Sequence, residues 1–161
     1  MDSTMTADKY VAIDPGANGA LVVFDRHKIL KIYKLIQHNS FPQMLDIIPD
    51  KSIAYIEDIR LRPQDARGGM FIRLEGFIRQ HERLKCALRV KCKDYEPVPP
   101  LTWQKSYGLV ANVKGAEKKN RHKKVAEMLE ENKGIKITLT NVDAILIARW
   151  AQRRIQQTKI K

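Results

Sequence analysis

Three acidic residues adjoin apolar runs, where a carboxylate can do chemistry. Asp14 and Glu57 each follow a short apolar run, and Asp143 precedes a longer one. A carboxylate in a buried strand costs several kcal/mol unless a positive group pairs with it. Each acid also has an ordinary structural explanation, because Asp14 fits an Asp-Pro-Gly turn, Glu57 a solvent-facing strand end and Asp143 a helix cap. If the three converge, however, they form a site that needs a cation.

The chemistry of such a site follows from its charge. Three carboxylates in one place repel each other by roughly 1–4 kcal/mol per pair, so a divalent cation is needed to keep all three ionised. Oxygen ligands favour Mg²⁺, or Mn²⁺ in its place, over Zn²⁺. Two such ions about 4 Å apart hydrolyse phosphodiesters. We therefore expect Asp14, Glu57 and Asp143 to be catalytic residues and metal ligands, with two ions per active site.

The elements that must position these acids indicate an α/β fold. Strands are expected at 9–14, 19–25, 29–36 and 52–59, with a fifth at either 88–90 or 95–98. The first three are joined by short turns and predict an antiparallel meander. Helices are expected at 40–48, 70–88, 101–108, 118–131 and 141–156, and a loop at 60–69. This order predicts a five-stranded mixed sheet flanked by helices.

Periodicity relates the acids to the sheet. Side chains alternate along a strand, so either Glu57 or Asp58 points toward a partner, and Tyr55 shares a face with Glu57. If the strands that carry Asp14 and Glu57 are neighbours, the two side chains converge. Small residues in the helix 141–156 predict close packing on the sheet, which would bring Asp143 near the strand ends.

Composition limits the class of protein. The chain has 161 residues, with 30 Lys and Arg against 18 Asp and Glu, for a formal net charge of +12. This length predicts one domain, 1–161, with 1–8 and 157–161 as flexible tails, and it is too short for a two-lobed actin-like or sugar-kinase fold. Positive charge spread over the central and late segments favours a polyanionic partner, DNA or RNA.

The cysteines and the N-terminus bear on the compartment. Cys86 and Cys92 lack a companion His pair and predict neither a zinc site nor a disulfide framework. Residues 1–9 lack the layout of a signal peptide, and no apolar run approaches the roughly 20 residues that span a bilayer. We expect a soluble intracellular protein, in the cytoplasm or nucleoid of a bacterial or phage-infected cell or in an organelle.

Taken together, the motifs resemble RuvC-type Holliday junction resolvases of the RNase H-like superfamily, especially their shorter phage and chloroplast forms. The matching segments occur in the family's order and span residues 10–150: they are 12–20, 55–58, 69–71 with Gly76, 99–105, 118–124 and 143–148. The resemblance implies an RNase H-like fold and Asp14, Glu57 and Asp143 as holders of the catalytic metals. It also implies a homodimer that makes paired nicks across a four-way DNA junction.

The resemblance implies further contacts with DNA. The helix that begins near Gly69 is the family's dimerisation and junction-facing element, in which Phe71 either stacks on an unpaired base or packs in the core. Trp103 is expected in core or hinge packing. The candidates for phosphate binding are Arg73, Lys105, Lys118, Lys119 and Lys123.

The sequence departs from the family at one ligand. The family usually adds an Asp or His one helical turn before the last Asp, where this chain has Leu139 and Thr140. Thr140, Asn141 or water would fill that position. Two other functions stay open: RNase H-like cleavage of other branched or hybrid nucleic acids, and junction binding by a catalytically weak protein.

Overall fold

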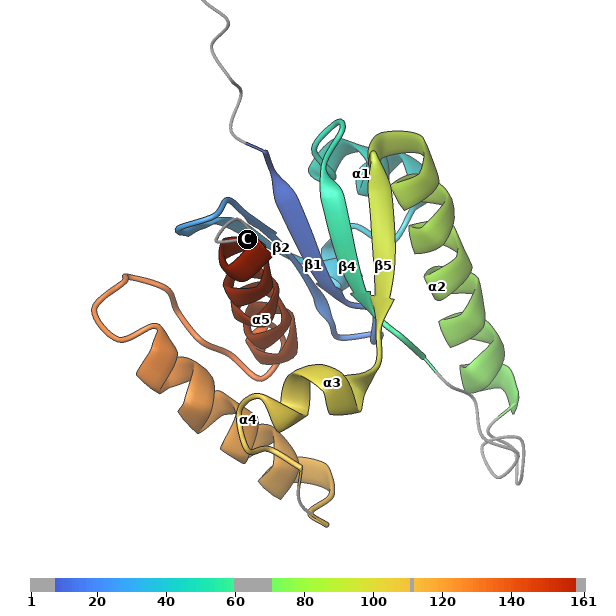
Figure 1. Cartoon of the computed structure of the whole chain (residues 1–161). Helices are drawn as coiled ribbons and strands as arrows, with labels where there is room; N and C mark the ends of the chain where they lie inside the picture. The colour runs from blue at the N-terminus through green and yellow to red at the C-terminus, as the bar shows by residue number, and fades with distance from the viewer. Residues whose placement is uncertain (1–7, 60–70, 111, 159–161) are drawn as a thin grey trace, which may run out of the picture.

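The chain folds as the predicted five-stranded mixed sheet with helices on both faces (Figure 1). The computed structural model describes residues 8–59, 71–110 and 112–158. The strands are β1 (Tyr10–Asp14), β2 (Ala20–Phe24), β3 (Ile29–Lys34), β4 (Ile53–Glu57) and β5 (Asp94–Val98). Their order is β3-β2-β1-β4-β5. The first three pair antiparallel, whereas β4 pairs parallel with both β1 and β5. This arrangement is consistent with the RNase H-like layout that the resemblance implies.

The helices also follow the sequence pattern. They are α1 (Phe41–Ile47), α2 (Phe71–Lys91), α3 (Pro100–Lys105), α4 (Gly115–Leu129) and α5 (Val142–Thr158), with a short 3-10 turn, η1 (Leu35–Gln37). Ser40 caps α1 in a reciprocal capping box with Gln43. Of the two candidates for the fifth strand, 95–98 is confirmed, because 88–90 continues α2. The predicted loop 60–69 lies outside the described residues, and α5 continues two residues into the expected C-terminal tail.

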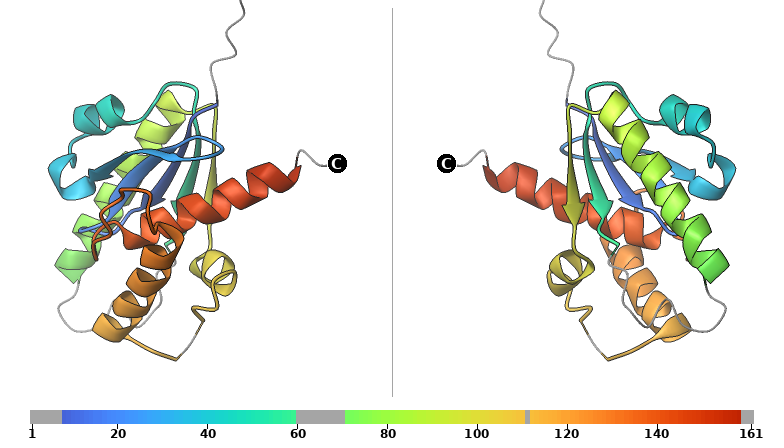
Figure 2. Two further views of the ribbon diagram at one scale, coloured as in Figure 1. Left: turned by 90° about the vertical axis from the view of Figure 1, so that its left-hand side faces the viewer. Right: turned by 90° about the vertical axis from the view of Figure 1, so that its right-hand side faces the viewer.

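The two faces of the sheet have separate cores. Val11, Ile13 and Ile56 pack beneath α1 and α2, whereas Ala12 and Tyr55 belong to the core on the opposite face, which α5 covers. Figure 2 shows α5 on one side of the sheet and α2 on the other. Because alternate side chains share a face, the next residues in the α5-facing series are Asp14 on β1 and Glu57 on β4.

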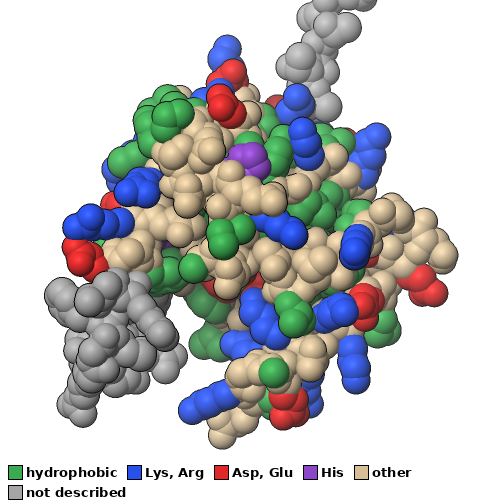
Figure 3. Space-filling model, turned by 180° about the vertical axis from the view of Figure 1, so that it is seen from behind, with side chains coloured by type: hydrophobic (Ala, Val, Ile, Leu, Met, Phe, Trp, Pro, Cys, Tyr) green, Lys and Arg blue, Asp and Glu red, His purple; other side chains and the backbone are tan. Residues whose placement is uncertain are grey.

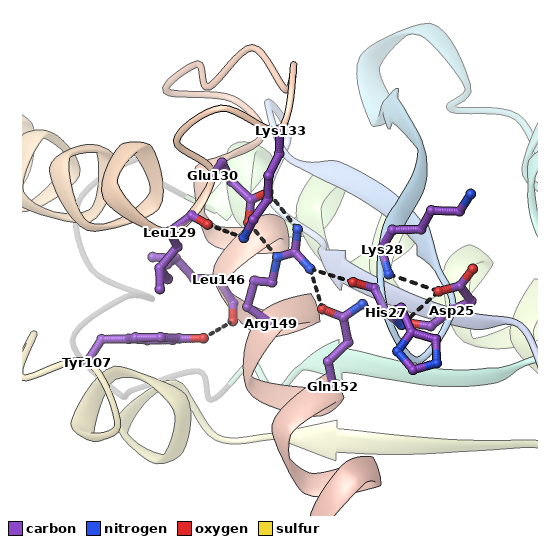
Figure 4. A network of polar contacts seen from close by, with 10 residues as sticks. All are labelled: Asp25, His27, Lys28, Tyr107, Leu129, Glu130, Lys133, Leu146, Arg149 and Gln152. Atoms are coloured by element: carbon purple, nitrogen blue, oxygen red, sulfur yellow. Dashed lines mark hydrogen bonds and ion pairs between the residues drawn. The ribbon is translucent and has the colours of Figure 1, made fainter.

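A buried polar network fixes α4 and the β2–β3 turn against α5 (Figure 4). Glu130, 3% exposed at the end of α4, accepts hydrogen bonds from both Nε and Nη2 of Arg149 on α5. Arg149 also donates to the carbonyl of His27 and to Gln152, which donates in turn to the carbonyl of Asp25. The network therefore sets how closely the residues of α4 approach those of α5.

The surface carries the positive charge that the composition predicts. Figure 3 shows Lys and Arg side chains dispersed over one whole face of the molecule, with fewer Asp and Glu side chains among them. In the described part of the chain, no helix is long and apolar enough to cross a membrane.

Candidate active site

The ends of β1 and β4 bring the first two acids together. The strands are parallel neighbours, and Ile13 lies opposite Ile56, so Asp14 and Glu57 follow the last paired residues side by side. Both point to the α5 face because of the strand alternation. Of the two acids that end β4, Glu57 therefore lies beside Asp14, as the sequence pattern allowed.

Two glycines shape the turn around Asp14, which is 8% exposed. The backbone N–H of Gly16 donates to Oδ1 of Asp14 at 3.1 Å, which orients the carboxylate. A Cβ atom on Gly19 would lie 2.0 Å from the carbonyl oxygen of Asp14, so only glycine fits there. The turn thus fixes both the backbone and the side chain of Asp14.

The third acid, Asp143, lies in the first turn of α5 and completes the cluster. Its Oδ1 atom is 2.7 Å from Nδ1 of His122, and its Oδ2 atom is 2.5 Å from Nζ of Lys119, both on α4. The same Nζ atom lies 3.8 Å from Oδ2 of Asp14. One ammonium group therefore contacts two of the three predicted acids. The contacts of Asp143 with α4 show that its role is not limited to capping the start of α5.

Burial and mutual repulsion shift the acids' protonation equilibria. Burial, together with the charges of Asp14 and Asp143, raises the pKa of Glu57 to about 8. Burial and the charge of Asp143 also raise the pKa of Asp14. For Asp143 the hydrogen bond from His122 and the charge of Lys119 outweigh burial, and its pKa falls below the usual value. Without a further cation, Glu57 is therefore mostly protonated at neutral pH.

The ligand chemistry of the acid cluster suits a divalent cation, but the ammonium group of Lys119 already contacts two of the acids. The three acids offer carboxylate oxygens, the ligands that Mg²⁺ prefers, and the negative charge of Asp143 raises the pKa of both Asp14 and Glu57. Among the described residues, no group of three or more His, Cys, Asp and Glu side chains already has a metal-binding arrangement. The ammonium of Lys119 contacts two of the carboxylates instead. A cation that bridges Asp14 and Asp143 must therefore compete with Lys119.

A cleft of about 420 Å³ opens beside Asp14, and Lys119, Leu139 and Thr140 line it with the glycine turn. Leu139 and Thr140, the two positions where the resemblance implies a fourth ligand, therefore both reach the cleft. The side chain of Asn141 is engaged elsewhere, since it accepts from the N–H of Thr138 and donates to a carbonyl in the preceding loop. Of the two residues considered for the gap, Thr140 is therefore the better placed.

Two site residues were not predicted as such. Trp103 is fully buried in the core, as expected, but its Nε1–H also donates to Oε1 of Glu57 at 3.2 Å. His122, 1% exposed, contacts Asp143 and drew no sequence argument. The available signal was its spacing, because it follows Lys119 by one helical turn and so shares a helix face with it.

The predicted phosphate-binding lysines occupy different environments. Lys119 is part of the acid cluster, whereas Lys105 is exposed at the end of α3. Lys118 is partly buried on α4, and Lys123 lies 3.5 Å from Glu127 on the same helix. The structure therefore brings only Lys119 of these four into the acid cluster.

The two remaining candidates for DNA contact lie in the first turn of α2. Phe71 and Arg73 are helical, but their side chains lie outside the described part of the protein. Their roles in stacking and phosphate binding stay predictions.

Comparison with known proteins finds no family model that matches the chain, and no curated protein matches it. The relation to RuvC-type resolvases therefore stays a resemblance carried by the motifs.

Proposed function

We propose that the protein is a Mg²⁺-dependent, structure-selective DNA endonuclease that resolves four-way junctions by paired nicks as a homodimer. The observation that carries this proposal is the meeting of Asp14, Glu57 and Asp143 at the ends of two parallel strands and the first turn of a helix, with a cleft beside Asp14. The formal charge of +12 supports a polyanionic substrate. The homodimer and the four-way junction come from the motif resemblance.

The side chains have distinct tasks in this proposal. Asp14, Glu57 and Asp143 would hold Mg²⁺, and the ion would supply the activation of water and the charge stabilisation that phosphodiester hydrolysis needs. Lys119 carries a positive charge at the cleft and would be suited to bind the scissile phosphate. Because the pKa of Glu57 is raised to about 8, Glu57 would have to lose a proton to serve as a metal ligand at neutral pH.

A cleavage assay on a labelled four-way junction tests the proposal. With Mg²⁺, wild type should give symmetric nicks with 5′-phosphate ends, and Asp14→Asn should bind the junction without cutting it. Asp46→Asn is the matched control, because Asp46 is exposed on α1, on the other face of the sheet. A junction left intact with both Mg²⁺ and Mn²⁺, together with intact linear controls, would reject the endonuclease.

One observation favours a second candidate, a junction-binding protein with little catalytic activity. Lys119 already neutralises the acid pair, and Thr140 stands where a fourth ligand is usual. In that case wild type and Asp14→Asn would bind the junction equally and neither would cut it. An RNA–DNA hybrid in the same assay distinguishes RNase H-like cleavage, which would use the same acids.

A further inference from the structure

A pair of buried aromatic side chains contacts the acids, and neither side chain lines the cleft. Trp103 of α3 and His122 of α4 meet edge to face, with ring centroids 5.4 Å apart and planes at 76°. Each ring also contacts one acid: the indole donates to Glu57, and the imidazole lies within hydrogen-bond distance of Asp143. The pair therefore connects two acids that come from different elements.

The surroundings of His122 indicate which way its hydrogen bond runs. The ring is almost fully buried, and Nδ1 lies 2.7 Å from the Oδ1 atom of Asp143. The carboxylate can only accept, so Nδ1 carries the hydrogen. The Nε2 atom is buried and has no hydrogen-bond partner in the described part of the chain. An apolar residue would fill this space without an unpaired polar atom, so packing alone does not explain a histidine here.

Trp103 shows the same combination of packing and directed bonding. Its ring is fully buried, and its one donor is used on Oε1 of Glu57. Helix α3 starts two residues after β5, which pairs in parallel with β4, so the indole and Glu57 are held by adjacent parts of the sheet. The bond leaves Oε2 of Glu57 available for another partner.

We propose that His122 and Trp103 are positioning residues, whose N–H groups each hold one oxygen of Asp143 and Glu57 so that the other oxygen faces a divalent cation. This inference rests on the proposed function only for the use of the cation, and it concerns cation affinity rather than cleavage. With Oδ1 of Asp143 held by the imidazole, Oδ2 faces Lys119 and Asp14. Partners that orient metal ligands in this way typically raise affinity by 10–100-fold.

Matched substitutions separate the N–H group from the volume of the side chain. His122→Asn places an amide N–H near the position of Nδ1, whereas His122→Leu has a similar volume and no donor. Trp103→Phe keeps an aromatic ring and removes the N–H. The Mn²⁺ dissociation constant is measured without DNA, by calorimetry and by electron paramagnetic resonance of the free ion. We expect His122→Leu and Trp103→Phe to bind Mn²⁺ about 10–100-fold more weakly and His122→Asn to stay within a few-fold of wild type.

The outcomes separate this inference from the endonuclease proposal. Mn²⁺ affinities of His122→Leu and Trp103→Phe within twofold of wild type would overturn the inference, even if wild type cuts junctions. Absence of Mn²⁺ binding by wild type would overturn it as well. The expected order of affinities in a protein that cuts no nucleic acid would support positioning and reject the endonuclease. If His122→Leu lacks a native near-ultraviolet circular dichroism spectrum, Trp103→Phe decides, because it conserves most of the ring contact.

Discussion

The Nζ atom of Lys119 lies 2.5 Å from the Oδ2 atom of Asp143, inside a cluster of three carboxylates. Although burial disfavours the ammonium form, the charge and hydrogen bond of Asp143 outweigh it and raise the pKa of Lys119. Lys119 is therefore charged throughout the neutral range and serves as the cluster's internal counter-ion. Any divalent cation at this place competes with it.

Removing this ammonium should strengthen cation binding. An ammonium group and a divalent cation about 4 Å apart repel by roughly 1–2 kcal/mol even at the dielectric constant of water, so we expect Lys119→Met to bind Mn²⁺ on the order of tenfold more tightly without DNA. The same variant should cut junctions more slowly, because the phosphate loses a partner. Calorimetry and single-turnover cleavage measure the two effects. Lys124→Met, which removes an exposed charge from the same helix, is the control, and equal Mn²⁺ affinity in both variants contradicts the competition.

Glu57 should make stability depend on pH when no divalent cation is present. Its pKa is about 8 in the folded protein against 4.5 ordinarily, so between these values the folded state holds a proton that the unfolded state has lost. The free energy of unfolding must then decrease as pH rises from about 4.5 to 8, by on the order of a few kcal/mol. Urea unfolding in EDTA at pH 5 and pH 8 should show this decrease in wild type and a smaller one in Glu57→Gln.

The control for this titration is Glu131→Gln, at an exposed position after α4, which should keep the decrease seen in wild type. Mg²⁺ should restore wild-type stability at pH 8 and have less effect on Glu57→Gln. A decrease of equal size in wild type and Glu57→Gln would show that Glu57 is not the group responsible.

Thr140 marks a place where a fourth acid is expected to fit. It lines the cleft beside Asp14, as does the adjacent Leu139, which is 52% exposed. Because Thr140 is the less exposed of the two, we expect Thr140→Asp to increase Mn²⁺ affinity more than Leu139→Asp does. Without metal, Thr140→Asp should lower the melting temperature through repulsion by Asp14. The reverse order of affinities would assign the fourth position to residue 139.

Gly19 should tolerate no side chain. A Cβ atom would lie 2.0 Å from the carbonyl oxygen of Asp14, so the strand end that carries this acid would have to shift. We expect Gly19→Ala to reduce the free energy of unfolding by more than about 2 kcal/mol and to weaken Mn²⁺ binding. Gly76→Ala in α2 is the control, because a Cβ atom added at this position would have nothing within 4 Å. This substitution should stabilise the helix by up to about 1 kcal/mol. Wild-type stability in Gly19→Ala would contradict the close approach.

Local patterns in the sequence predicted much of the fold and the three acids. Asp14 and Glu57 were both predicted at strand ends, alternation left either Glu57 or Asp58 to face a partner, and Ser40 marked the start of α1. The choice of the fifth strand stayed open, because 88–90 and 95–98 are both short segments of mixed apolar and polar residues without a decisive period. Only the continuation of α2 through Lys91 removed the first of them.

The sequence by itself determined which three acids are candidates for the site, because strand periodicity, caps and charge are properties of neighbouring residues. It did not determine which basic or aromatic residue would reach the acids. That depends on how α4 packs against α5. The ion pair of Glu130 and Arg149, which are 19 residues apart in the sequence, holds the two helices together. Only the tertiary structure therefore placed Lys119 between two carboxylates, His122 beside Asp143 and Trp103 beside Glu57. Contacts between segments that are distant in the sequence leave no periodic pattern in it.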